Sequence, residues 1–373
     1  MKNNFQRCTR CVMDNSSDNS ISFDENGVCN YCTYTLERKD KVYFPNQIGE
    51  EKLNSLFEKL KIDGKGKKYD CLMGISGGLD SAYLAYIAYE KGLRILAFHI
   101  NDGFNTEISE SNVKNLCAKS NIDLIEEFPD KEQFIDVIRA FFKAGVPGIC
   151  NAQDNIITSY LYKNAVKFGI RNFLSGSNFS LESILQRGEG INASDGFHIK
   201  SISKMFGSKG YDKLPFISLF DSYIKTKYIY KVKMYKPLDF IDYNKDRAIR
   251  ELNEFCGFNY YGGKHYENVL TYFVQSYYLP NKFGIDKRNS HLSSLIMSNQ
   301  ITREEAILEL EKPLYDAEKM DKTIDFICEK LNFTREEFES ILNSPPKSHY
   351  DYPYSNLNKF AKTARRFRKY LND

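Results

Sequence analysis

The sequence contains no apolar run of the roughly 18 residues that a membrane-spanning helix requires. Its first residues, Met-Lys-Asn-Asn-Phe-Gln, also lack the apolar core of a signal peptide. Charge of one sign is scarce as well: 52 basic and 49 acidic residues give a net charge of +3, which is too weak by itself to argue for nucleic acid as a partner. With 373 residues, 42% of them hydrophobic, the chain can bury a substantial core. We therefore expect a cytoplasmic globular protein without a transmembrane segment.

Disulfides are not expected in such a protein, so its nine cysteines need another explanation. Four of them form two Cys-x2-Cys pairs, Cys8 with Cys11 and Cys29 with Cys32. Each pair turns two thiolates toward one point, and four thiolates satisfy a tetrahedral Zn²⁺ without leaving a position for water. We expect a structural zinc site in a ribbon-like module over residues 1–45, with a short strand at residues 21–23. Because few basic residues flank the cysteines, we expect this module to pack on the rest of the chain rather than on RNA.

No Gly-x4-Gly-Lys-Ser/Thr loop, the Walker A phosphate-binding motif, occurs in the sequence. Instead, an apolar run over residues 69–75 ends in Ser-Gly-Gly-Leu-Asp-Ser at residues 76–81 and continues as an apolar helical segment. Two adjacent glycines let an anion approach the backbone, and the first turn of the following helix offers unpaired N–H groups. The pattern resembles the PP-loop of the ATP pyrophosphatases, which cleave ATP between its α and β phosphates. The alternative is an ordinary glycine-rich turn of an α/β domain.

Strand and helix patterns alternate over residues 46–255, where we expect the PP-loop domain. Strands are expected at residues 94–100, 122–128 and 171–174 after the first one, and helices at 50–60, 108–119, 131–143, 156–168 and 245–255. This alternation predicts an α/β fold with a doubly wound parallel sheet. Residues 181–235 resemble an irregular insertion over the sheet edge, and residues 235–241 return to a strand-like composition.

Two further features lie at the ends of expected strands, where ligands of open parallel sheets bind. These are His99 and the small-residue loop Ser175–Asn178, although either also fits a purely structural role. The residues expected to bind ATP are therefore Gly74, Ser76, Gly77, Gly78, Asp80, Ser81, His99, Gly176 and Ser177.

The sequence lacks a second cysteine at a position where one class of PP-loop enzymes often has it. PP-loop enzymes that thiolate tRNA often carry Cys-x2-Cys after their third helix, whereas here Cys150 is followed by Gln153. Without a persulfide-forming pair, sulfur transfer is disfavoured. We expect Cys150 to be a buried thiol.

Two neighbouring segments, residues 260–268 and 279–292, mix cations with aromatic residues and glycines. Their potential cations are Lys264, His265, Lys282, Lys287, Arg288 and His291. Such a cluster suits a polyanionic substrate or the charge of an adenylated intermediate. The alternative is a solvated charged face, but the glycine pair and the aromatic residues favour a functional site.

Taken together, several motifs resemble those of the N-acetyl sugar amidotransferase family of surface-polysaccharide and O-antigen biosynthesis. They are the cysteine pairs, Gly-Ile-Ser-Gly-Gly-Leu-Asp-Ser, Ser-Gly-Ser-Asn, Gly-Gly-Lys-His-Tyr-Glu and Leu-Pro-x-Lys-Phe-Gly-x-Asp-Lys-Arg, and they run from Cys8 to about Glu305. The resemblance implies that an N-acetyl group on a nucleotide-activated sugar is converted to an acetamidino group with ATP and ammonia. One departure is Asn289, where the family pattern leads us to expect a further basic residue.

On this basis, the expected catalytic residues are Asp80, Lys264, His265, Lys282 and Arg288. Asp80 would bind Mg²⁺, the lysines and the arginine would neutralise the α-phosphate or the sugar nucleotide, and His265 would handle protons. The chain has neither a cysteine at position 2 nor a Gly-x-Cys-x-Gly elbow, so we expect ammonia to come from a separate glutaminase subunit. No nucleic acid partner is expected. The alternatives are a tRNA-modifying thiolase or lysidine-type synthetase, and a zinc-ribbon binding protein with a retired ATP site.

The region from residue 256 to residue 373 reads as mainly helical. Thr-Arg-Glu-Glu occurs at residues 302–305 and again at 334–337, and each predicts a helix that begins with a capping box. A last, basic helix is expected over residues 357–371, most simply as a solvated terminus.

Overall fold

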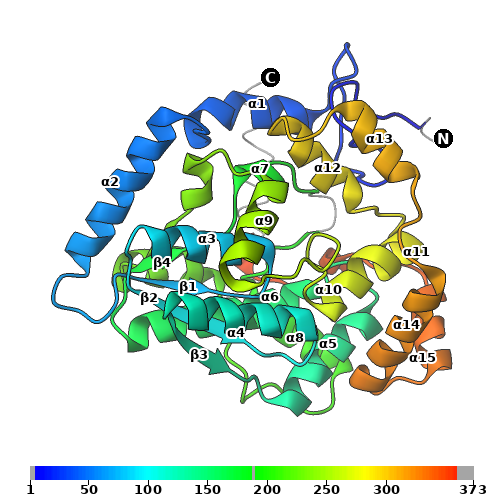
Figure 1. Ribbon diagram of the computed structural model, residues 1–373. Coiled ribbons are helices and arrows are strands. Elements are labelled where there is room, and N and C mark those ends of the chain that lie inside the picture. Colours follow the sequence, from blue (N-terminus) through cyan, green and yellow to red (C-terminus); the bar gives the residue numbers. More distant parts are fainter. Residues whose placement is uncertain (1–4, 187–189, 359–373) are drawn as a thin grey trace.

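A computed structural model describes residues 5–186 and 190–358, which Figure 1 shows in colour. Its centre is a five-stranded sheet in the order β3-β2-β1-β4-β5, and every strand pairing is parallel. The strands are β1 (Cys71–Gly74), β2 (Ile95–Ile100), β3 (Asp123–Glu127), β4 (Asn172–Leu174) and β5 (Lys233–Tyr235). The predicted doubly wound parallel sheet is confirmed, and the strand order reverses beside β1.

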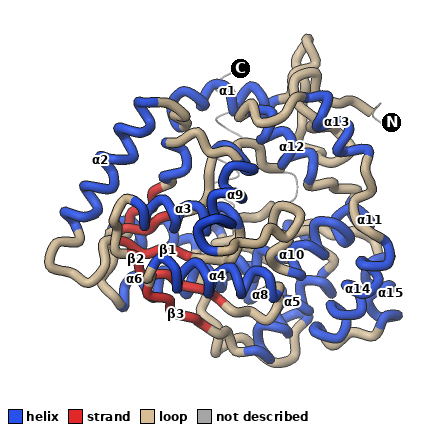
Figure 2. Tube along the Cα trace, viewed as in Figure 1, coloured by secondary structure: helices blue, strands red, loops and turns tan. Residues whose placement is uncertain are grey.

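Alternating side chains of β1 explain why helices cover both faces of the sheet (Figure 2). Cys71 and Met73 pack with the helices of one face, whereas Leu72 packs on the opposite face with Ala165 of α6. The first face carries α3 (Leu79–Glu90), α4 (Glu107–Ser120) and α9 (Lys245–Cys256). The second carries α6 (Cys150–Lys167), against which α5 (Lys131–Ala144) packs. Two N-terminal helices, α1 (Asn30–Val42) and α2 (Gln47–Asp63), precede the sheet.

Three sequence-based expectations about secondary structure were wrong. The expected strand over residues 235–241 ends at Tyr235, because Pro237 lacks an N–H for the strand ladder and begins a 3-10 helix, η2 (Pro237–Phe240). Helix α6 begins at Cys150 rather than at Ile156, which brings its first turns to the carboxyl edge of the sheet. The expected strand at residues 21–23 is only an isolated bridge between Phe23 and Cys29.

The region expected to be irregular contains helices of its own. They are α7 (Phe179–Glu182), α8 (Gly196–Phe206) and a π-helix, η1 (Asp221–Ile229). Helix α8 buries Ile199 and Ile202 in the core that also contains the apolar face of α5. The insertion is therefore anchored on the second face of the sheet.

The C-terminal region is helical, as predicted. Its elements are α10 (Val269–Phe273), the π-helix η3 (Val274–Tyr278), α11 (Leu279–Phe283), α12 (Arg288–Met297), α13 (Arg303–Glu311), α14 (Ala317–Leu331), α15 (Arg335–Asn343) and the 3-10 helix η4 (His349–Asp351). Thr302 and Thr334 each form the predicted capping box. Within the ranges that the structure describes, no helix is both long and apolar enough to cross a bilayer. The expected basic helix at residues 357–371 lies almost wholly outside those ranges, and the division into residues 1–45, 46–255 and 256–373 stays a prediction.

Two buried histidines link the insertion to the C-terminal segment and to the start of α6. The Gly148 N–H donates to His349 Nε2 (3.0 Å), so His349 carries its proton on Nδ1 and donates it to His198 Nε2 (3.0 Å). His198 in turn donates from Nδ1 to the Pro353 carbonyl (2.9 Å). Each ring is thereby fixed as one neutral tautomer. Burial lowers the pKa of His349 to about 3, and it also lowers the pKa of His198.

We expect the His198–His349 pair to make the free energy of unfolding depend on pH in the acid range. Between the pKa of an unfolded histidine, 6.5, and the folded value of about 3, the unfolded chain binds a proton that folded His349 does not. The free energy of unfolding should therefore fall as pH drops through this window, by about 1.4 kcal/mol per pH unit for one group. His349→Phe should lose this contribution to the slope and should cost about 1–3 kcal/mol at pH 7, because the Gly148 N–H loses its acceptor. Urea unfolding of both proteins at pH 7 and pH 5 measures the difference, and parallel pH dependences would contradict the assignment.

Candidate active site

The predicted phosphate-binding loop joins β1 to α3. Ser76 Oγ lies 3.4 Å from Ser81 Oγ and accepts a hydrogen bond from the Gly78 N–H (3.2 Å). Gly77 has a φ of +80°, and a Cβ there would lie 2.3 Å from the Ser109 carbonyl oxygen, so this position requires glycine. Gly78 is the N-cap residue of α3 and has no side chain to occupy the helix N-terminus. The loop therefore presents two hydroxyls and a helix N-terminus to an anion.

The loop after β4 packs directly against this first loop. A Cβ at Gly176 would lie 3.0 Å from the Ser81 backbone nitrogen, which explains the small residue there. Since β1 and β4 are neighbours in the sheet, the two loops flank the point where the strand order reverses. Open α/β sheets bind their ligands at this point.

Asp80, in the first turn of α3, is held from two sides. The Tyr243 hydroxyl donates to Asp80 Oδ1 (2.5 Å), and Lys264 Nζ lies 3.4 Å from Asp80 Oδ2. The same ammonium lies 3.1 Å from Glu182 Oε1 on α7. Burial opposes the charge of Lys264, but the two carboxylates outweigh it and raise the lysine pKa; Lys264 likewise lowers the pKa of Glu182 against the effect of burial. A charged lysine is thus fixed beside the loop at neutral pH.

These groups open onto one cavity of about 1220 Å³. Its walls come from both loops, from the first turns of α6, from residues 260–268 and from α12. The predicted site residues that line it are Gly74, Ser76, Gly78, Asp80, Ser81, His99, Gly176, Ser177, Lys264, His265 and Arg288. The structure thus brings most of the predicted residues together. Gly77 belongs to the loop but does not line the cavity, and Lys282 lies outside the cavity.

Tyr261 and Glu267 also contact the phosphate-binding loop, and the sequence reasoning missed both. The Leu79 N–H donates to the Tyr261 hydroxyl (2.8 Å), and a Cβ at Gly78 would lie 2.8 Å from Glu267 Oε1. Within the described residues, Glu267 Oε2 is buried without a hydrogen-bond partner. Both residues lie in the aromatic and polar segment that the sequence did single out, and its Tyr-Tyr-Gly-Gly pattern was the available signal.

His99 is held by the backbone, although its ring borders the cavity. Its Nδ1 donates to the Ile75 carbonyl (2.7 Å), and its Nε2 accepts from the Asn105 amide (3.2 Å). Both ring nitrogens are therefore satisfied by the protein, which favours a role in shaping the end of β1 over direct contact with the nucleotide.

His265 and His291 both line the cavity. Their ring centroids are 6.0 Å apart, and His265 Nδ1 lies 3.6 Å from Glu267 Oε1. Burial, together with the neighbouring Lys264 and His265, lowers the pKa of His291 well below its usual value. His291 is consequently neutral at physiological pH, while His265 is the more accessible of the two for proton transfer.

Two of the predicted cations, Lys282 and Arg288, bind backbone carbonyls at the C-terminal ends of neighbouring helices. Lys282 Nζ donates to the carbonyls of Ile341 (2.6 Å) and Ser344 (2.7 Å) at the end of α15, and Lys282 does not line the cavity. Arg288 does line it, but its guanidinium pairs with Asp286 (2.8 Å) and donates to carbonyls at the end of α13. Helix C-termini attract cations because their last carbonyls lack partners. The structure therefore does not support substrate contact by Lys282, and it leaves Arg288 largely engaged.

We expect Lys282→Met to change stability more than chemistry. Lys282 is buried, with 8% of its surface exposed, and burial lowers its pKa. Methionine fills the same space but leaves the α15 carbonyls without a charged donor, so the free energy of unfolding should fall by about 2–3 kcal/mol. Denaturant unfolding measures this. Unchanged stability combined with lost activity would instead indicate that Lys282 acts in the active site.

Cys150 and Gln153 follow the predicted pattern in part. Cys150 is half-buried and lines the cavity, with its Sγ 4.0 Å from Thr271 Oγ1, and burial raises its pKa to about 12. Gln153, which stands where a second cysteine was looked for, donates to Asp102. Cys150 is therefore a protonated, poorly nucleophilic thiol at neutral pH, and sulfur transfer stays disfavoured.

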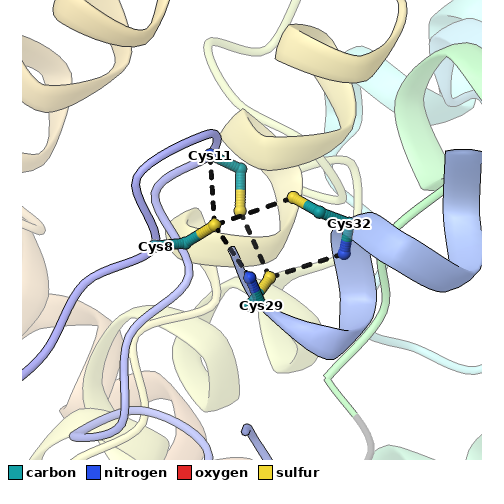
Figure 3. A group of neighbouring side chains, drawn as sticks. All are labelled: Cys8, Cys11, Cys29 and Cys32. Carbon is teal, nitrogen blue, oxygen red and sulfur yellow. Dashed lines mark hydrogen bonds between the residues drawn. The ribbon is translucent and has the colours of Figure 1, made fainter. Parts of the chain in front are cut away.

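The four cysteines of the N-terminal module converge on one point, as Figure 3 shows. Cys8 Sγ lies 3.8 Å from Cys32 Sγ, Cys11 Sγ lies 3.7 Å from Cys29 Sγ, and all four sulfurs lie within 4.8 Å of one another. Zn–S bonds of about 2.3 Å in a tetrahedron hold sulfurs about 3.8 Å apart. The four side chains are fully buried, and the Met13 N–H donates to Cys11 Sγ (3.4 Å). The donor set and its geometry fit a structural zinc ion.

The zinc module packs on the C-terminal region of its own chain, as expected. Arg303 donates to the carbonyls of Cys8 (2.9 Å) and Cys11 (3.1 Å). Asn289, on α12, is buried and donates to Asp14 Oδ2 of the module (3.1 Å). Asn289, where the resemblance led us to expect a basic residue, therefore belongs to this internal interface.

Comparison with known proteins supports the family resemblance drawn from the sequence. Residues 267–367 match the family model described as LPS biosynthesis protein WbpG-like, C-terminal domain, and the match includes the Leu-Pro-x-Lys-Phe-Gly motif. No curated protein matches the chain.

Solved structures with similarity include two synthetases. NMN synthetase from Francisella tularensis is 14% identical, with a TM-score of 0.35, and the match covers 78% of this chain and 95% of that one. NH3-dependent NAD synthetase from Campylobacter jejuni is 15% identical, with a TM-score of 0.31, and the match covers 70% of this chain and 97% of that one.

Proposed function

We propose that this chain, whose residues 267–367 match the WbpG-like family of LPS biosynthesis, is the synthetase component of an ATP-dependent amidotransferase. Its substrate would be a nucleotide-activated diacetamido sugar, one N-acetyl group of which becomes an acetamidino group. The reaction would form AMP and pyrophosphate. The observation that carries the proposal is the charged Lys264, fixed 3.4 Å from Asp80 beside the Ser76–Ser81 loop in a cavity of about 1220 Å³.

Replacing an amide oxygen by nitrogen requires that the oxygen first become a leaving group. In the proposed first step, the acetamido oxygen attacks the α-phosphorus of ATP, the bond from that phosphorus to the bridging oxygen breaks, and pyrophosphate leaves. Ser76, Gly78 and Ser81 would hold the β and γ phosphates through hydroxyls and backbone N–H groups. Lys264 would neutralise charge on the α-phosphate as it becomes five-coordinate. The product is an O-adenylyl imidate.

The residues beside the loop fit a magnesium ion bound with ATP. Asp80 is available as a carboxylate ligand, and Glu267, whose Oε2 is buried without a partner in the described chain, lies against Gly78. Hard divalent cations prefer such oxygens. When bound, Mg²⁺ would supply charge neutralisation for the phosphates.

Several observations support an external source of ammonia. All nine cysteines lie in the described part of the chain, and four of them form the zinc cluster. Burial raises the pKa of each of the other five, Cys71, Cys117, Cys150, Cys256 and Cys328. A cysteine glutaminase needs an activated thiolate. We therefore propose a separate glutaminase as partner.

The test uses the chain alone with ATP, Mg²⁺ and ammonium chloride. UDP- and CMP-linked diacetamido sugars are supplied in turn, and the products are analysed by mass spectrometry. Conversion of acetamido to acetamidino replaces O by NH and lowers the mass by about one unit. We expect this product together with AMP and pyrophosphate for one sugar, and none with glutamine in place of ammonium. AMP formation on tRNA but on no sugar nucleotide would contradict the proposal.

A further inference from the structure

One carboxylate in the cavity has no role in the scheme above. Asp154 lies in the second turn of α6, and its exposed side chain borders the cavity. Within the described part of the chain it accepts no hydrogen bond and forms no ion pair. This helix contributes only apolar residues and amides to the same wall otherwise, apart from the Cys150 thiol.

The other acids of the cavity have a partner within the described residues or a role in the scheme above. Asp80 and Glu182 share Lys264, and Asp102 accepts from Gln153 and from the Phe104 N–H (2.9 Å). Glu267 lies near His265, and Asp286 pairs with Arg288. The acids at the outer rim, Glu305 and Glu309, bind Thr302 and Lys312. Asp154 is thus the cavity acid that has neither a partner within the described residues nor a part in the proposed adenylation.

The surroundings of Asp154 suit a proton-donating ligand. His265 is the titratable group that acts on Asp154, and Lys264, the residue before His265, reaches Asp80 of the phosphate-binding loop. Burial raises the pKa of Asp154 to about 6, which His265 partly offsets. A carboxylate with such a pKa is ionised at neutral pH and still basic enough to take a proton from a reacting group.

The proposed reaction creates positive charge in the cavity. An acetamido group is neutral, whereas an acetamidino group is a cation, and ammonia becomes a cationic nitrogen as soon as it forms a bond to carbon. A cation forming inside a cavity that also contains Lys264 and His265 needs a nearby anion.

We propose that Asp154 is the general base of the amination step, receiving the proton of the ammonia that adds to the adenylated substrate. This inference rests on the proposed function. Ammonia donates its lone pair to the carbon of the protonated imidate, and the C=N electron pair moves to the sugar nitrogen. The new –NH3⁺ group gives one proton to the Asp154 carboxylate and becomes –NH2. The C–O bond then breaks, AMP leaves with the bonding pair, and an amidinium remains. Asp154 returns its proton to solvent.

The experiment separates the two half-reactions in Asp154→Asn. We expect sugar-dependent ATP–pyrophosphate exchange to stay within about 3-fold of the wild type, while amidine formation from ammonium falls by roughly 100-fold or more. Asp154→Glu should recover part of the amination. Glu132→Gln, an exposed acid on α5 outside the cavity, is the matched control and should change neither rate.

A second measurement keeps the inference testable even if the variant folds poorly. The rates of amidine formation and of ATP–pyrophosphate exchange are measured for the wild type from pH 5 to pH 8 at fixed total ammonium. The ratio of the first rate to the second should fall below about pH 6 more steeply than the rate of a control reaction that consumes the same ammonia. The titratable groups that interact with Asp154 and bear on this profile are His265 and Cys150.

The outcomes distinguish this inference from the proposed function. Amidine formation by Asp154→Asn at the wild-type rate overturns the inference alone. Loss of exchange together with amination in a folded variant also overturns it, since Asp154 would then act in substrate binding or adenylation. Absence of sugar-dependent exchange in the wild type refutes the proposed function and removes this step with it.

Discussion

Replacing Lys264 by methionine is expected to reduce ATP–pyrophosphate exchange by roughly 100- to 1000-fold, because removing a preorganised charge beside a developing oxyanion has costs of this order. Lys264 Nζ lies between Asp80 (3.4 Å) and Glu182 (3.1 Å), and its side chain is only 16% exposed. The rate is measured with ATP, pyrophosphate and the sugar nucleotide that the product assay identifies. A decrease of less than about 5-fold would contradict a role at the α-phosphate.

A purely structural role for Lys264 predicts a different pattern. Its loss leaves two buried carboxylates facing each other, which raises the pKa of Glu182 and destabilises the fold. Lys264→Met combined with Glu182→Gln removes this repulsion. If Lys264 acts on the phosphate, the double variant should recover stability in denaturant unfolding but not activity. Recovery of both would assign Lys264 to the ion pair alone.

The sequence was most informative where local spacing determines the chemistry. The loop at residues 76–81 and the cysteine pairs are complete within a few residues, and both have the expected geometry. The sheet was also predictable, because apolar strands that alternate with helices leave few topologies. The capping boxes at Thr302 and Thr334 succeeded for the same reason, since a cap is a contact between residues three positions apart.

The sequence could not assign the cations correctly. Lys264 and Lys282 both lie in segments rich in aromatic residues and glycines, yet one contacts the phosphate-binding loop and the other the end of α15. The difference depends on which distant helix ends nearby, and no local pattern encodes that. Asn289 is a similar case, because its partner Asp14 lies in the zinc module at the other end of the chain.

The missed residues of the site are those whose role depends on tertiary distance. Tyr243 reaches Asp80 from across the domain, and Asp154 faces the cavity only because α6 begins six residues earlier than its apolar periodicity indicated. Residues 150–155 read Cys-Asn-Ala-Gln-Asp-Asn, and this run of polar residues was treated as a connection between helices. Its polarity is explained by the cavity that the first turns of α6 border.

The zinc module supports the active site through α12. The Val12 N–H donates to Ser293 Oγ (3.2 Å), and Lys39 Nζ donates to the Met297 carbonyl (2.8 Å). Ser294 of the same helix accepts from the Ile184 N–H (3.0 Å), just after α7. Since α7 carries Glu182, the partner of Lys264, a continuous set of contacts joins the module to the phosphate-binding loop.

Loss of the metal is accordingly expected to unfold the module and to disable the distant site. Structural zinc contributes about 10–16 kcal/mol in zinc-finger peptides, which equals or exceeds the whole stability of a typical domain. We expect about one zinc per chain in the purified wild type by elemental analysis. Cys11→Ser should retain little of it, lose hydrogen-exchange protection over residues 8–32 and α12, and show little exchange activity. The matched control is Cys117→Ser, which removes an equally buried thiol on α4 and should keep the metal. A metal-free wild type, or a Cys11→Ser protein with a full equivalent of zinc, would contradict a structural zinc site formed by the four cysteines.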